Sequence, residues 1–136
     1  MRLDKLPTDA CALEPTTPVT DIGSVTTWLR SQPGLEAGAS VTRSFATTGA
    51  IQMDLAAHDE GACEFSTPRY VAIRPHESSA TCCTGFQLNV GEVVIAYLFG
   101  SDVVIAAFAV APTQSEADIL IPKVDSVLQT IAIDWP

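Results

Sequence analysis

The sequence predicts an α+β fold, a mostly antiparallel twisted sheet of five to seven strands with two main helices packed on it. Three observations lead to this prediction. Residues 93–110 form two apolar, β-branched and aromatic runs around Gly100, Ser101 and Asp102, which are typical of a hairpin turn. Residues 50–58 alternate apolar and polar side chains, which is the period of a strand. Two other segments carry apolar residues at helical spacing.

Length and composition bound the domain organisation. The chain has 136 residues, of which 47% are hydrophobic and 17% charged. These values suit one core-forming domain. Residues 1–20 are rich in proline, so we expect them to form an N-terminal surface arm with at most one short helix. Residues 21–136 should then form a single α+β domain.

The first predicted helix follows this arm. Ser24 is a good N-cap residue, and we expect a helix over 24–31. Its apolar side chains recur at helical spacing and should face the sheet: Ile22, Val25, Trp28 and Leu29. Pro33 and Gly34 should end the helix.

Several short strands should come next. Residues 40–46 and 50–58 are strand-like, and the link at 47–49 is short enough for a hairpin. In the second strand Ile51, Met53, Leu55 and Ala57 share one face, and Gln52 and Asp54 share the other. Residues 69–75 and 85–90 predict two further strands.

The apolar stretch at 93–111 is interpreted as a hairpin and not as a membrane span. It is nineteen residues long and has a single charge, at Asp102. A spanning helix would place Asp102 near the bilayer centre, at a cost of about 2.5–3.5 kcal/mol. We therefore expect no transmembrane segment. Because both faces of the hairpin are apolar, it should need a layer of structure on each side.

The C-terminal segment predicts the second helix. Ser115 with Asp118 three residues later resembles a capping box. Pro122 should break a continuous helix, so we expect it in the first turn of the helix proper. That helix should bury one apolar stripe: Val124, Val127, Leu128 and Ile131. Residues 131–135 should form a short edge strand.

The charge balance argues against several classes of partner. The chain has 16 acidic and 7 basic side chains, a formal net charge of −9, and no cluster of Lys or Arg. Such a surface repels phosphate backbones, so we expect no nucleic-acid partner. Residues 1–15 lack the apolar core of a signal peptide. We expect either a cytosolic protein or a chain whose signal or membrane anchor has been removed.

Four stretches of the chain carry a family resemblance: "VTTWLRSQPGLEAG", "TTGAIQMDL", "NVGEVVIAYLFGSDVVIAAFAV" and "VDSVLQTIAI". Their order resembles a group of uncharacterised bacterial envelope domains. More loosely, it is similar to the PsbP-like α/β/α sandwich of LpqN-type bacterial lipoproteins. The resemblance covers residues 24–135, although the usual strand glycine pair is a single Gly49 here. It implies an extracytoplasmic location, secreted or membrane-anchored, and no catalytic residues.

The sequence contains no catalytic signature. It lacks a G-x-S-x-G elbow, an H-E-x-x-H motif, a phosphate loop and a dinucleotide fingerprint, and its only histidines are His58 and His76. We therefore predict a non-enzymatic extracytoplasmic module without a cofactor, which binds an unknown protein or a small apolar ligand. The alternatives are a metal-binding or metal-sensing envelope domain and, third, an unrecognised hydrolase.

The cysteines are the most distinctive chemical feature. There are four of them, Cys11, Cys63, Cys82 and Cys83, and the last two are adjacent. An even number, together with the resemblance to extracytoplasmic domains, predicts a disulfide framework. A bridge from Cys63 to Cys82 or Cys83 would close a loop and stabilise the fold by roughly 3 kcal/mol, and Cys11 would take the other neighbour. The alternative is a zinc or copper site made by Cys63, His76, Cys82 and Cys83.

The candidate binding site lies in the two loops that these cysteines would join, 58–66 and 75–84. Loops held by a rigid sheet commonly carry binding residues. The candidate residues combine two histidines, two acids and one apolar anchor: His58, Asp59, Glu60, Phe65 and His76.

Overall fold

The computed structural model of the chain describes residues 2–7, 15–32, 35–46, 48–57, 69–72, 74–75, 85–88 and 91–133. Two helices are present there, α1 (Ile22–Ser31) and α2 (Gln114–Leu128). The strands are β1 (Arg2–Pro7), β2 (Pro15–Pro18), β3 (Leu35–Ala37), β4 (Val41–Phe45), β5 (Thr48–Ala57), β6 (Arg69–Ala72), β7 (Arg74–Pro75), β8 (Gly85–Leu88), β9 (Val93–Phe99) and β10 (Val104–Ala111).

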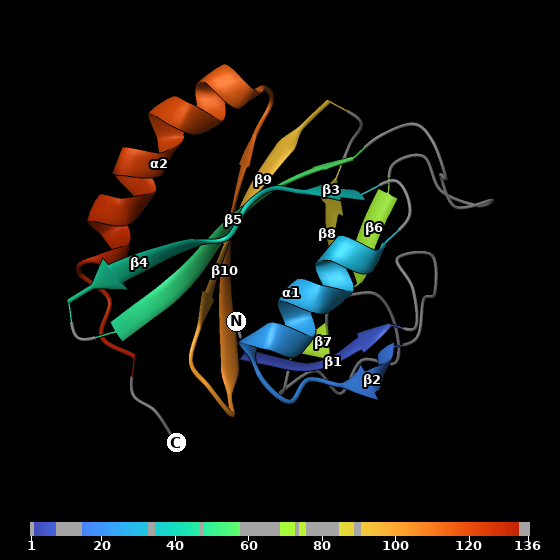
Figure 1. Cartoon of the computed structure of the whole chain (residues 1–136). Helices are drawn as coiled ribbons and strands as arrows, with labels where there is room; N and C mark the ends of the chain where they lie inside the picture. The colour runs from blue at the N-terminus through green and yellow to red at the C-terminus, as the bar shows by residue number, and fades with distance from the viewer. Residues whose placement is uncertain are drawn as a thin grey trace.

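The main sheet confirms the predicted fold class. It follows the order β2-β1-β10-β9-β5-β3, and every described strand pair is antiparallel (Figure 1). With β4 and β7 the sheet has eight strands, slightly more than predicted. Two strands lie off the six-strand path: β4 shares one edge of β5 with β3, and β7 pairs with β1. Strands β6 and β8 form a separate two-stranded sheet.

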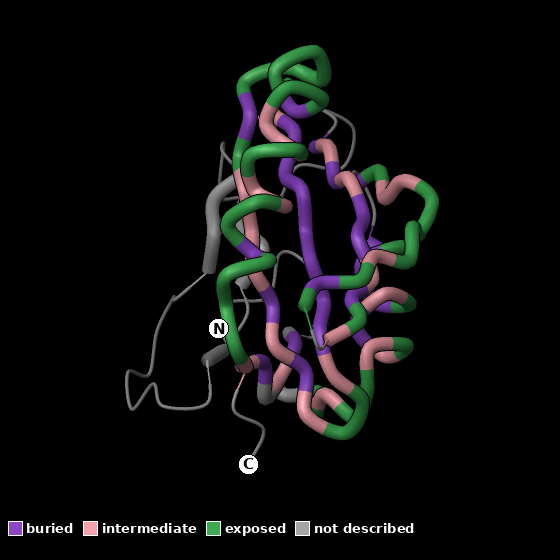
Figure 2. Tube along the Cα trace, turned by 90° about the vertical axis from the view of Figure 1, so that its left-hand side faces the viewer, coloured by how far each residue is buried: buried purple, intermediate pink, exposed green. Residues whose placement is uncertain are grey.

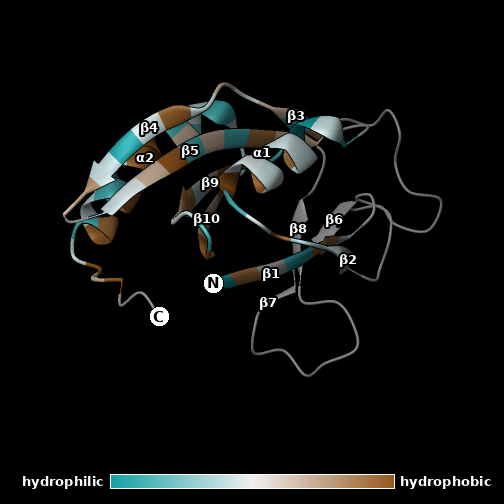
Figure 3. Ribbon diagram, turned by 60° about the horizontal axis from the view of Figure 1, so that its bottom comes forward, coloured by the Kyte–Doolittle hydropathy of each residue, from teal (hydrophilic) through white to brown (hydrophobic). Residues whose placement is uncertain are grey.

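The hairpin of β9 and β10 is the centre of the molecule. All seven residues of β9 are buried, and they alternate between two separate core clusters. Val94, Ala96 and Leu98 join the cluster that includes residues of α1, whereas Ile95 and Tyr97 join the cluster that includes residues of α2. The two helices therefore cover opposite faces of the sheet, as a hairpin with two apolar faces requires. Figure 2 shows the buried strands in the middle of the molecule, and Figure 3 shows apolar residues along β9 and β10.

Residues 2–7 lie in the main sheet, although we expected them in a surface arm over residues 1–20. Residues 2–7 form β1, which pairs with β10 inside the main sheet. Leu3 and Leu6 are buried in the cluster on the α1 face. Proline is compatible with strands that lie near a sheet edge, so a proline-rich segment can still extend a sheet. Residues 2–7 therefore share the core cluster on the α1 face.

Helix α1 has the predicted buried stripe but a different N-cap. Asp21, not Ser24, caps it: an Oδ1 oxygen of Asp21 accepts from the Ser24 backbone N–H at 2.6 Å. The Ser24 hydroxyl oxygen in turn accepts from the Asp21 N–H at 3.3 Å, which completes a capping box. Val25, Trp28 and Leu29 are buried as expected.

Helix α2 corrects three predictions. It is one helix from Gln114 to Leu128 with Pro122 inside it. Its N-cap is Thr113, whose hydroxyl accepts from the Glu116 N–H at 3.3 Å, so the predicted start at Ser115 is wrong. Val127 is exposed, although we expected it in the buried stripe. The buried residues of the helix are Ala117 and Leu128.

The remaining expectations concern strands. Residues 131–133 are not in a strand, so the predicted C-terminal edge strand does not form there. The single strand predicted at 69–75 is two strands with different partners, because β6 pairs with β8 and β7 pairs with β1. The hairpin of β4 and β5 and the hairpin of β9 and β10 form as predicted. No helix of the described chain is both long and apolar enough to cross a membrane.

Candidate functional site

The candidate residues chosen from the sequence lie outside the described residues. This holds for every cysteine, for both histidines and for the other members of the candidate binding loops: Cys11, Cys63, Cys82, Cys83, His58, His76, Asp59, Glu60 and Phe65. The disulfide framework, the alternative metal site and the loop site therefore stay predictions. Among the described residues, no group of three or more His, Cys, Asp or Glu could hold a metal ion.

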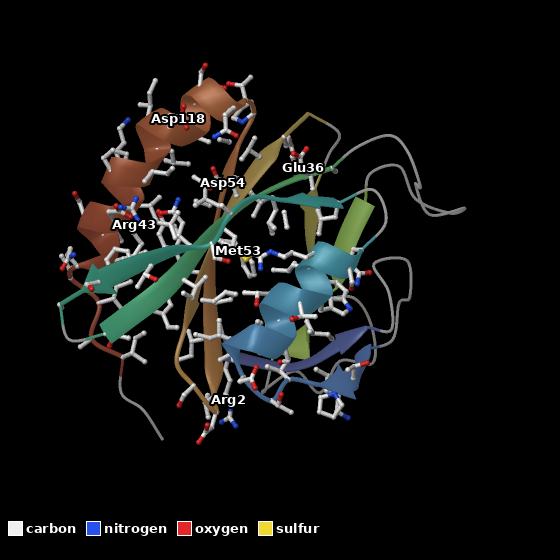
Figure 4. All side chains as sticks on the ribbon, viewed as in Figure 1. Arg2, Glu36, Arg43, Met53, Asp54 and Asp118 are labelled. Carbon is white, nitrogen blue, oxygen red and sulfur yellow. The ribbon has the colours of Figure 1, made fainter. Side chains whose placement is uncertain are left out.

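The structure shows two other features that sequence analysis did not single out, and both lie under α2. The first is a chain of polar side chains between the helix and the sheet. Tyr97 on β9 donates its hydroxyl to Asp125 on α2 at 3.0 Å. The second carboxylate oxygen of Asp125 lies 3.3 Å from the Arg43 guanidinium on β4. Figure 4 shows Arg43 between β4 and the helix.

This polar chain continues along the sheet and returns to the helix. Arg43 Nε donates to the Gln52 side chain at 2.7 Å, and Gln52 donates to Asp54 at 3.5 Å. Gln114, in the first turn of α2, donates to Asp54 at 3.4 Å and to Asp118 at 3.0 Å. Gln52 is buried, so the polar face of β5 is covered and does not point into solvent. These groups satisfy one another, so the chain serves to attach α2 to the sheet.

Tyr97 is the most perturbed titratable group of the described residues. Burial raises the pKa of its phenol well above the ordinary value of 10.0, and the hydrogen bond to Asp125 raises it further. Tyr97 therefore stays neutral and acts as a hydrogen-bond donor. A phenol held in this way suits a structural role, because it is buried and its hydroxyl is engaged by Asp125 on α2.

The second feature is an apolar pocket of about 150 Å³ at one end of the sheet. Three parts of the chain meet there: the turn between β4 and β5, the end of the β9–β10 hairpin, and the C-terminal end of α2 with the residues after it (Figure 1). The lining residues are Phe45, Thr48, Phe99, Ile105, Ala106, Ala107, Leu128, Ile131 and Ile133. Thr48 is the only polar residue in this lining.

The walls of the pocket are held by packing and by hydrogen bonds. Phe45 contacts Tyr97 edge-on and Phe99 at a tilt, with ring centroids 5.8 Å apart in both pairs. Gln129, just after α2, accepts from the Ala46 N–H at 2.8 Å and donates to the Ser44 carbonyl at 3.1 Å. These bonds join the end of α2 to the β4–β5 turn, so two walls of the pocket are fixed relative to each other.

One residue marks the mouth of the pocket. Ile131 is 49% exposed although it belongs to the lining, so the pocket communicates with the surface on its side. The observed end of α2 explains this exposure. Because the helix ends at Leu128, Ile131 is not part of its buried stripe. The prediction that Ile131 is buried is therefore wrong.

A sequence signal for the pocket exists in β10. Ala107 is a small residue on the α2 face of β10, and its partner on β9 is Tyr97. A small residue in an apolar strand leaves space above it unless another element fills that space. Which element lies above Ala107 depends on the placement of α2, and the pattern of the strand does not contain that information.

Comparison with known proteins gives no relative. No family model matches the chain, and neither does any curated protein or solved structure.

Proposed function

We propose that this chain is a binding module that holds a small apolar ligand, of the size of one aromatic ring or a short alkyl chain, in the pocket under α2. The observation that carries this proposal is the lining itself, which is aliphatic and aromatic except for Thr48. An apolar cavity of about 150 Å³ is large enough to take up a ligand such as benzene. The same size excludes a long lipid chain.

The position of the pocket supports binding. Its floor is the central hairpin, in which Phe99 is 3% exposed, so the site is largely formed before a ligand arrives. Its mouth carries the half-exposed Ile131, which gives a ligand a way in from solvent. A rigid floor lowers the entropy that binding must overcome.

Toluene is a suitable probe for this proposal. We expect a titration followed by methyl NMR to give saturable shifts at Ile105, Ile131 and Ile133, which line the pocket. Ile22 packs against the opposite cluster and provides an internal reference that should not move. Absence of a saturable shift at all three pocket isoleucines would refute the proposal.

Two variants sharpen the test. Ala107→Leu should fill the pocket and abolish toluene binding, whereas Ala109→Leu adds the same volume two residues further along the same face, outside the lining. Ile131→Ala enlarges the mouth and should weaken binding with little loss of stability, because this side chain is half exposed. Equal toluene binding by the Ala107→Leu and Ala109→Leu proteins would place the ligand elsewhere.

The expected location outside the cytoplasm is a second part of the proposal, supported by the four cysteines and by the family resemblance.

The competing hypothesis of a zinc or copper site depends on Cys63, His76, Cys82 and Cys83. Elemental analysis of the purified protein by mass spectrometry distinguishes the metal-binding hypothesis from the apolar binding module. One equivalent of bound zinc or copper would favour the metal hypothesis.

A further inference from the structure

The register of the sheet aligns one row of residues across five strands at the pocket. Arg43 on β4 pairs with Ala50 on β5, which pairs with Phe99 on β9. Phe99 pairs with Ile105 on β10, and Ile105 pairs with Arg2 on β1. Residues directly opposite each other in antiparallel strands point to the same face. Ala50, Phe99 and Ile105 all belong to the cluster under α2, so the whole row lies on the α2 face.

The two arginines at the ends of this row have different surroundings. Arg43 is engaged by Asp125 at 3.3 Å. Arg2 is partly buried beside Ile105, a residue of the pocket lining, and no described carboxylate lies within ion-pair distance of it. Cα atoms of paired residues are about 5 Å apart, which an arginine side chain spans. Figure 4 shows Arg2 at the end of the sheet where the β9–β10 turn lies.

We propose that the ligand of this pocket is a small aryl- or alkyl-carboxylate, whose apolar part fills the pocket and whose carboxylate pairs with Arg2. This inference rests on the proposed function. A planar guanidinium offers two parallel N–H donors that match the two oxygens of a carboxylate. The partial burial of Arg2 next to an apolar wall strengthens such a pair relative to one in open water.

The rest of the molecule opposes anion binding, and this makes the role of Arg2 separable. The chain has a net charge of −9, and Asp102 is exposed in the turn between β9 and β10. At long range these charges repel an anion. Any preference for a carboxylate over a neutral ligand of the same shape must therefore come from a local cation, and Arg2 is the cation that the register places beside the pocket.

Three ligands that share a phenyl ring test the inference. They are phenylacetate, phenylacetamide and 2-phenylethylamine, and their dissociation constants can be measured by methyl NMR titration of Ile105 and Ile131. We expect phenylacetate to bind about three- to tenfold more tightly than phenylacetamide, the range of a partly exposed charged hydrogen bond. In Arg2→Gln the order should reverse, with phenylacetate weaker and phenylacetamide unchanged.

Matched variants separate local from general charge effects. Lys5→Gln removes the same charge from the same strand and should leave the preference for phenylacetate intact. Arg2→Lys should retain part of the preference, because it keeps the charge but loses the paired donors. Asp102→Asn should lower the dissociation constant of phenylacetate slightly, because it removes a negative charge from the β9–β10 turn.

The outcomes distinguish the two proposals. Equal affinity for phenylacetate and phenylacetamide, tightest binding of the amine, or an unchanged preference in Arg2→Gln overturns the carboxylate inference and leaves the apolar pocket standing. Failure of all three ligands to bind, together with failure of toluene, overturns the proposed function itself.

Discussion

At the scale of single residues, a buried tyrosine helps to fix the position of α2 on the sheet. Tyr97 is fully buried in the middle of the central strand, and its hydroxyl reaches Asp125 on α2 at 3.0 Å. A buried hydroxyl without a partner costs roughly 1–3 kcal/mol, so this bond constrains where the helix can lie. Arg43 holds the other oxygen of Asp125 and thereby fixes the carboxylate between two strands and one helix.

The raised pKa of Tyr97 predicts how the free energy of unfolding changes at alkaline pH. Because burial and Asp125 raise the pKa of Tyr97 above 10.0, the folded state keeps a proton that the unfolded state loses near that pH. The stabilisation is thus fully present below pH 10 and is lost as the pH rises further. We expect Tyr97→Phe to lower the free energy of unfolding by about 0.5–1.5 kcal/mol at pH 7. Above pH 10 the wild type should lose stability relative to this variant, by about 1.4 kcal/mol per pH unit.

Urea denaturation at pH 7, 9, 10.5 and 11 measures both stabilities. The comparison with Tyr97→Phe removes the contribution of every other group that titrates at high pH, since those groups are shared. Parallel pH profiles for the two proteins would contradict the assigned shift.

At the scale of elements, α2 is the part of the fold that the sequence describes least well. Thr113 caps its start, accepting from the Glu116 N–H and donating to the Glu116 carboxylate at 3.0 Å, and the helix then passes through Pro122 without ending. Pro122 is exposed, so its ring lies on the solvent side of the helix and meets no packed neighbour there. The helix persists because both of its ends are attached, by Gln114 to β5 and by Gln129 to the β4–β5 turn.

A substitution distinguishes a continuous helix from one that begins at the proline. A proline in a helix interior costs up to about 3 kcal/mol relative to alanine, partly offset by the stiffer unfolded chain. We expect Pro122→Ala to raise the free energy of unfolding by about 1–2 kcal/mol in urea denaturation. Lys123→Ala, at the neighbouring exposed position, is the control and should change it by less than about 0.5 kcal/mol. A neutral or destabilising effect of Pro122→Ala would favour a helix that starts at Pro122.

At the scale of the whole molecule, the fold is three layers around one hairpin. Helix α1 covers one face of the sheet and α2 covers the other, and each cluster contains alternate residues of β9. The pocket arises where this third layer ends, because α2 stops at Leu128 while the sheet continues to the β9–β10 turn. The pocket is therefore a consequence of a mismatch in length between a helix and the hairpin beneath it.

The cysteines give a prediction for the whole chain. If all four form disulfides, the intact mass of protein folded under oxidising conditions and then denatured without reductant should lie four hydrogen atoms below the four-thiol value. Treatment with a reductant should restore the difference, and this serves as the control. Four thiols that all react with iodoacetamide before reduction would show that the framework does not form.

The accuracy of the sequence predictions follows from the range of the interactions involved. The β9–β10 hairpin, the β4–β5 hairpin and the stripe of α1 could be predicted, because their information lies within a few residues of turn chemistry and periodicity. The N-terminal strand could not, since Leu3 and Leu6 are two apolar residues in the short segment RLDKLP, and this strand joins the main sheet by pairing with β10, about a hundred residues away. The pocket and its row of Arg2, Ile105 and Phe99 depend on strand register and on where α2 ends. Local pattern specifies which residues form an element, whereas packing between distant elements specifies which side chains share a site.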